Sequence, residues 1–146
     1  MISETVISDQ RATVVSQSGR EGKVLALPAV QSFRDLVVWQ RSLELAAAVY
    51  RMTGDFPREE LYGLTSQMRR CAVSVPSNIA EGQGRLTTGE FRQFLGIARG
   101  SNSELQTQLE IARRLEMGKA RQIDEAEGLS HEVGKMIHAI LNKISD

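Results

Sequence analysis

Apolar residues recur at helical spacing in four runs from residue 33 to the end of the chain, separated by glycine, proline or polar residues. The first run closes at Gly54, which suits the C′ position after a helix. Asp55-Phe56 reads as a turn, and Pro57 suits the first position of a following helix. The apolar stripe of the first run is Phe33, Leu36, Leu43, Ala47 and Tyr50.

The other three runs predict three more helices. Thr87 and Glu90 form a capping box at the start of the third helix, and Gly118 is expected to end it. Leu86 and Phe91 stand where a hydrophobic staple would clamp that helix start. The second stripe, over about residues 58–82, is Leu61, Leu64, Met68, Cys71, Val75 and Ile79. The third is Phe91, Leu95, Ala98, Leu105, Leu109 and Ala112. The fourth is Ile123, Leu129, Val133, Met136, Ile137, Ile140, Leu141 and Ile144.

Pro76 interrupts the second run, because it lacks an N–H and its ring crowds the carbonyl of Ala72. The apolar rhythm nevertheless continues across it in phase, and a new helix from Asn78 to Gly82 would be too short to stand alone. We therefore predict one kinked helix that ends near Gly82. Ser77 or Asn78 would bond backbone groups that the kink exposes, or a neighbouring helix.

Four amphipathic helices with short connections predict an all-α fold, an antiparallel up-down-up-down four-helix bundle with a kinked second helix. This domain spans residues 33–146. Residues 1–32 are mixed polar and are expected to form a flexible N-terminal extension, or alternatively a tail that docks on a partner. The composition agrees with packed helices, since 41% of the 146 residues are hydrophobic and only 5% are aromatic.

Charge and cysteine content narrow the choice of partner and compartment. Eighteen basic and eighteen acidic residues cancel, so nucleic-acid contact would need a local patch. The single cysteine, Cys71, excludes an internal disulfide and is expected to be a buried apolar residue. No stretch approaches the ~20 apolar residues of a membrane span. The first thirty residues lack a signal-peptide pattern, so we expect a cytoplasmic protein without membrane contact.

Catalysis is not indicated by any set of residues. His131 and His138 are seven apart, about 10 Å along a helix, too far to share a metal unaided. Gly82 and Gly84 lack the lysine and spacing of a phosphate-binding loop. We therefore expect no catalytic residues, no metal and no cofactor.

Three segments resemble one known family: FRDLVVWQRSLELA, YGLTSQMRRCAVSVPSNIAEGQGR and FRQFLGIARGSNSELQTQLEIA. This four-helix-bundle family was first noticed as products of intervening sequences in bacterial large-subunit ribosomal RNA genes. The resemblance covers residues 33 to about 144. The chain departs from the family pattern at Asn102-Ser103, where a larger apolar residue is more common. The strongest family signature is Pro76, Ser77, Asn78, Glu81 and Gly82.

The resemblance implies a ring-like homopentamer without enzymatic activity. It also implies a link to the similar, basic accessory protein of diversity-generating retroelements, which contacts reverse transcriptase and nucleic acid. This chain departs from that relative in being neutral overall.

Arginines offer a candidate patch for nucleic-acid phosphates. Residues 58–99 hold six arginines and four glutamates, a local excess of two positive charges. Arg92, Arg99 and Arg113 share one helix face. The alternative is a solvated face, or one paired between subunits. The candidate nucleic-acid contacts are Arg69, Arg70, Arg85, Arg92 and Arg99.

Small residues suggest a candidate oligomer contact. Gly96, Gly100, Ser103 and Thr107 line one face of the third helix, and glycine within a helix suggests close approach by another helix. That helix could belong to the same bundle or to another subunit. Trp39 is a second candidate interface residue, with a buried role as its alternative.

Together these features predict a non-enzymatic, cytosolic, homo-oligomeric scaffold. The alternative is an accessory factor that binds RNA or DNA, in a ribonucleoprotein or with a reverse transcriptase, through the arginines.

Overall fold

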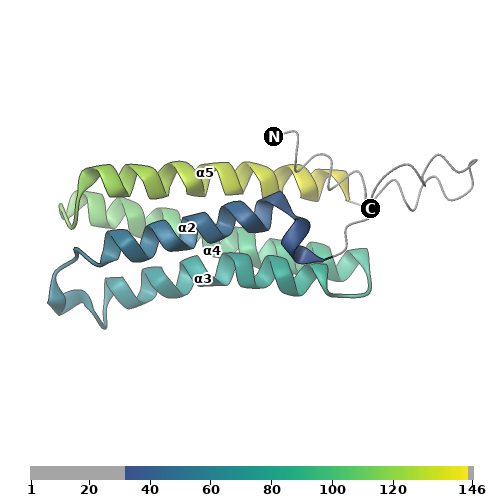
Figure 1. The fold of residues 1–146 in the computed structure, drawn as a ribbon, viewed down its shortest axis with the longest axis horizontal. Coiled ribbons are helices and arrows are strands. Elements are labelled where there is room, and N and C mark those ends of the chain that lie inside the picture. The colour runs from purple at the N-terminus through teal and green to yellow at the C-terminus, as the bar shows by residue number, and fades with distance from the viewer. Residues whose placement is uncertain (1–31, 145–146) are drawn as a thin grey trace, which may run out of the picture.

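The computed structural model describes residues 32–144. The predicted extension therefore lies almost entirely outside the described residues. Within them the chain contains helices and no strand (Figure 1). The elements are the 3₁₀ turn η2 (Phe33–Asp35), α2 (Val37–Thr53), the 3₁₀ turn η3 (Arg58–Glu60), α3 (Leu64–Gln83), α4 (Thr88–Arg114) and α5 (Ala120–Lys143).

The four long helices form a bundle, as the apolar pattern predicts. Helices α2 and α4 each pack against both α3 and α5, so α2 and α4 lie diagonally across the bundle. Figure 1 shows the α2–α3 and α4–α5 connections at one end and the α3–α4 connection at the other. Consecutive helices therefore run in opposite directions.

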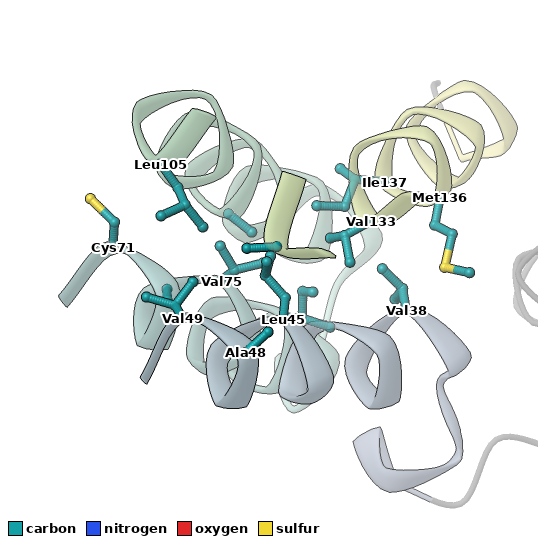
Figure 2. Packing of buried hydrophobic residues seen from close by; sticks show 14 of the residues in the cluster. Val38, Leu45, Ala48, Val49, Cys71, Val75, Leu105, Val133, Met136 and Ile137 are labelled. Carbon is teal, nitrogen blue, oxygen red and sulfur yellow. The ribbon is translucent and has the colours of Figure 1, made fainter. Parts of the chain in front are cut away.

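The core lies between the four helices. Leu45 of α2, Val75 of α3, Leu105 of α4 and Ile137 of α5 converge on its centre, and all four side chains are fully buried (Figure 2). The whole stripe predicted for α4 is buried, as is the stripe predicted for α5 apart from the half-buried Leu129. Both predictions are confirmed to this extent.

The stripe predicted for the first helix is wrong. Leu36 is buried but precedes α2, while Leu43, Ala47 and Tyr50 are exposed on its outer side. The residues of α2 that enter the core are instead Val38, Leu45, Ala48, Val49 and Met52. Helix α2 is apolar over much of its circumference, so two stripes fit the helical period and only packing against α3 and α5 selects one.

The second helix begins later than predicted. Pro57 precedes the short turn η3, and α3 starts at Leu64, whose N–H donates to the Glu60 carboxylate at 3.0 Å. Leu61 is consequently exposed outside the helix. Helix α3 then runs without a break to Gln83 with Pro76 inside it, so the prediction of one continuous helix is confirmed, while the kink at Pro76 stays a prediction.

The start of α4 is partly as predicted. The Thr87 hydroxyl accepts the Glu90 N–H at 3.1 Å, which confirms the N-cap. The staple is wrong, because Leu86 is 96% exposed. Phe91 packs instead against Gly82 of α3, where an added Cβ would lie 3.1 Å from its ring. Gly82 is therefore needed for close helix packing as well as lying near the end of α3.

A buried polar cluster joins α4 to α5. Asn102 Nδ2 donates to the Ser130 carbonyl at 2.9 Å, and Ser130 Oγ donates to Asn102 Oδ1 at 2.8 Å. Gln106 Nε2 donates to the same hydroxyl at 2.9 Å. An added Cβ on Gly134 would lie 3.2 Å from Asn102 Nδ2, so glycine leaves room for the amide. Because buried polar groups need partners, this cluster favours one register of α4 against α5.

An ion pair joins α2 to α5. Arg41 donates from Nη2 and Nε to the two Glu132 carboxylate oxygens at 2.6 and 3.0 Å. This bonding lowers the pKa of the Glu132 carboxyl and raises the pKa of Arg41. Both groups therefore remain charged at neutral pH and fix the angle at which α5 meets α2.

Candidate functional site

The exposed large apolar residues of the described chain lie on α2, α3, α4 and the loops, and none lies on α5. They are Leu43, Tyr50, Leu61, Tyr62, Val73, Leu86, Ile97, Ile111 and Leu115. Several of them gather on the outer sides of α2, α3 and α4, so those three helices carry the candidate interaction surfaces.

The first candidate surface, which we name the α4 face, consists of Gly96, Gly100, Ser103 and Thr107 with Ile97 and Ile111 beside them. All six are exposed, and an added Cβ on Gly96 or Gly100 would have no neighbour within 4 Å. The glycines therefore make no close contact inside the bundle. An intersubunit role for Gly96, Gly100 and Ser103 remains a prediction.

The second candidate surface, the α2 ridge, consists of Trp39, Leu43 and Ala47. Trp39 is half-buried and meets the Phe33 ring edge-on, with centroids 5.0 Å apart. Leu43 is 42% exposed and Ala47 is also exposed. Three apolar residues at intervals of four along a surface helix make a ridge that another helix can pack on.

The third candidate surface is a hollow of about 790 Å³ beside the α2–α3 connection, which we name the α2–α3 groove. Its side chains mix exposed apolar groups with two cations. Tyr62 is 92% exposed at one end. Its principal lining residues are Tyr50, Leu61, Tyr62, Arg69, Arg70 and Val73. Ser77 and Asn78 of the signature also line it.

The five predicted arginines are not one patch. Arg69 and Arg70 line the α2–α3 groove, whereas Arg85, Arg92 and Arg99 lie on the α3–α4 loop and α4. Arg85 pairs with Glu81 at 2.9 Å and lies over the Phe94 ring. Arg92 donates to the Leu141 carbonyl at 2.9 Å, near the end of α5.

Arg92, Arg99 and Arg113, which were predicted to share one helix face, also differ in their partners. Arg113 pairs with Asp124 and Glu127 of α5, so its charge is compensated within the chain. Arg69, Arg70, Arg92 and Arg99 have no carboxylate partner among residues 32–144.

The signature residues mainly shape α3. Pro76 is buried, and Asn78 Nδ2 donates to the Ser74 carbonyl at 2.8 Å and to the Ser74 hydroxyl at 3.0 Å. That hydroxyl also bonds Ser101 Oγ of α4 at 2.8 Å. Asn78 thus bonds both the helix backbone and the polar link between α3 and α4, as its spacing after the proline predicts.

Cys71 lies on α3, and the two histidines of the chain lie on α5. Burial raises the pKa of the Cys71 thiol and outweighs the opposing effect of the hydrogen bond that Gln108 donates to its sulfur at 3.5 Å, so the thiol stays protonated and weakly nucleophilic. His131 and His138 are both exposed on α5. Residues 32–144 bring together no three His, Cys, Asp or Glu side chains able to hold a metal ion. No described helix has the length and apolar character needed to cross a membrane.

The family model for the 23S rRNA-intervening sequence protein matches residues 34–139, nearly the whole helical bundle. The chain belongs to this family. A solved structure of similar fold is a protein with unknown function from the S23 ribosomal protein family of Bacteroides thetaiotaomicron. The two share 25% identity and a TM-score of 0.65 over 73% of this chain and 96% of that one. No curated protein matches the chain.

Two surface features of this family member were not predicted from the sequence. Leu43 and Ala47 were expected in the core, and the α2–α3 groove was not predicted. The groove could have been suspected from Tyr62, a large aromatic residue next to Gly63 that lies outside the predicted apolar stripe.

Proposed function

We propose that this protein is a non-enzymatic scaffold of the cytoplasm that assembles with copies of itself, in a pentameric ring as the family resemblance implies. The observation that carries the proposal is the α4 face, where two helix-internal glycines have open space above them. Glycine within a helix costs about 1 kcal/mol against alanine. Nothing inside the bundle requires glycine at Gly96 or Gly100, and the exposed Ile97 and Ile111 beside them, which have no counterpart on α5, favour a close contact outside the bundle.

The α2 ridge supplies a surface that fits the α4 face. Because α2 and α4 lie diagonally across the bundle, their outer sides point in opposite directions. A contact between the ridge of one copy and the α4 face of the next is therefore head-to-tail, and such contacts close into a ring when the rotation allows it. The polar outer side of α5 would stay in solvent.

Replacing Gly100 with glutamate is expected to dissociate the assembly into monomers. An unpaired carboxylate buried in a contact costs about 3–5 kcal/mol, while the helix itself gains from losing a glycine. Native mass spectrometry and light scattering give the subunit number. Gly128→Glu is the matched control, because Gly128 is a helix-internal glycine with open space on the neighbouring helix α5, whose outer side is polar.

The Gly128→Glu protein should keep the wild-type subunit number. A wild-type protein that is monomeric at cellular concentration would refute the scaffold proposal. Equal subunit numbers for wild type and Gly100→Glu would show that the α4 face is not the contact between subunits.

A second candidate function is an accessory factor for RNA, in a ribonucleoprotein or beside a reverse transcriptase. It is favoured by Arg69, Arg70, Arg92 and Arg99, four of the five candidate arginines, which have no carboxylate partner among the described residues. Arg99 is exposed on α4 and therefore suits phosphate contact without a structural role.

If this second function holds, Arg99→Gln should weaken binding of structured RNA several-fold at low ionic strength, and added salt should weaken wild-type binding steeply. A gel-shift titration measures both. Arg121→Gln, an exposed arginine at the start of α5, is the control. Absence of wild-type binding at low ionic strength would exclude this function.

A further inference from the structure

The α2–α3 groove has the chemistry of a site for an apolar, acidic segment. Tyr50, Leu61, Tyr62 and Val73 give it exposed apolar surface. None of the residues that line it carries a carboxylate. An uncovered surface of this kind is typical of a contact with another segment or molecule.

The two cations of the groove are held in different ways. Arg69 lies 4.6 Å from the centroid of the Tyr50 ring and donates from Nε to Thr53 Oγ1 at 2.8 Å, so its position is fixed. Arg70 is exposed and donates to Ser66 Oγ at 3.3 Å. Both guanidinium groups therefore retain N–H donors for a carboxylate.

The chain itself carries a segment with matching chemistry. Residues 2–9, ISETVISD, combine three branched aliphatic side chains with the carboxylates of Glu4 and Asp9 and contain no basic residue. The other apolar segment before the bundle, residues 23–30, KVLALPAV, contains a lysine and no acid. Charge complementarity therefore selects residues 2–9.

The length of chain outside the described structure is sufficient. Residues 10–31 separate Asp9 from Ser32, where the described structure begins, and extended chain spans up to about 3.3 Å per residue, or roughly 70 Å in total. The groove lies at the far end of α2, whose 17 residues extend about 25 Å. Attachment to the same chain also keeps the segment at a high effective concentration, on the order of millimolar.

We propose that residues 2–9 dock in the α2–α3 groove of their own chain. The carboxylates of Glu4 and Asp9 pair with Arg69 and Arg70, and the aliphatic side chains cover Tyr50, Leu61, Tyr62 and Val73. This contact uses neither the α4 face nor the α2 ridge, so it is independent of the proposed assembly.

Amide hydrogen exchange of residues 1–10 in the full-length protein tests the proposal. We expect slower exchange than in a free peptide of the same sequence, and about a tenfold loss of this protection in Arg70→Glu, where attraction becomes repulsion. Arg70 is exposed and supports no core contact, so the fold should persist. Arg99→Glu, an equal charge change on α4, should leave the protection intact.

Reversing the charges of the docked segment provides the decisive experiment. Adding Glu4→Arg and Asp9→Arg to Arg70→Glu should restore protection. Exchange as fast as in the free peptide, or protection unchanged by Arg70→Glu, would overturn the proposal. If protection disappears in the monomeric Gly100→Glu protein, the groove binds a neighbouring copy. If protection changes with nuclease treatment, the groove binds nucleic acid. Either result would also overturn the proposal.

Discussion

Gly82→Ala should lower the free energy of unfolding by about 1–3 kcal/mol, even though alanine is the better helix former. An added Cβ would lie 2.8 Å from Phe94 Cβ and 3.3 Å from the Phe91 carbonyl oxygen. Neither atom is at the flexible end of a side chain, so α3 and α4 would have to separate. Chemical denaturation followed by circular dichroism gives the change.

Gly128→Ala is the control for this prediction. An added Cβ on Gly128 meets nothing within 4 Å, so the same chemical change should raise the free energy of unfolding by about 0.5–1 kcal/mol. Opposite signs at the two glycines would show that packing against Phe91 and Phe94 decides the outcome. A stabilised Gly82→Ala protein would mean that the two helices can move apart at little cost.

Asn102→Leu is the second change with a large expected effect, a loss of about 2–3 kcal/mol. Leucine keeps a branched side chain of similar size but removes both bonds between Asn102 and Ser130. The Ser130 hydroxyl would then lie fully buried without its acceptor. Thermal and denaturant unfolding at neutral pH measure the loss.

The double variant Asn102→Leu/Ser130→Ala tests this explanation. Removing both polar partners is far less costly than removing one, so the pair should recover most of the lost stability. Ser130→Ala alone serves as the other single variant of the cycle. Strictly additive losses would show that Asn102 contributes through its shape and not through this hydrogen-bonded cluster.

The sequence specified the buried faces of α4 and α5 but not that of α2. Along α4 the residues between the apolar positions are mostly polar or small, so one stripe stands out. In VVWQRSLELAAAVYRMT of α2, both Leu43 and Leu45 lie on apolar stripes of helical period. The choice between them depends on α3 and α5, which periodicity within α2 alone does not contain.

Helix boundaries were likewise predicted where they depend on local sequence and missed where they depend on tertiary contacts. The Thr87 N-cap is local chemistry and was predicted, whereas the exposed position of Leu86 depends on how α3 leads into the loop. The later start of α3 depends on the Glu60 side chain reaching Leu64 N. A proline suited to a first helical position therefore marked a nearby turn and not the helix itself.

For the candidate surfaces, the sequence indicated which residue types matter but not which of those residues lie together in space. Five arginines on two helices appeared to form one set, but the bundle separates Arg69 and Arg70 from Arg92 and Arg99. Gly96 and Gly82 both lie inside helices, yet one has open space and the other contacts two phenylalanines. Such differences arise from the partner helix and require the tertiary structure.

The position of α2 also affects the order in which the chain folds. Helices α2, α3 and α4 each contact the next helix along the chain, but α2 also needs α5 to cover its second side. The Arg41–Glu132 pair spans 91 residues, so this contact closes the longest loop, at the greatest entropic cost. During synthesis the apolar surface of α2 therefore stays uncovered until nearly the whole chain has left the ribosome. This makes α2 the helix most exposed to aggregation.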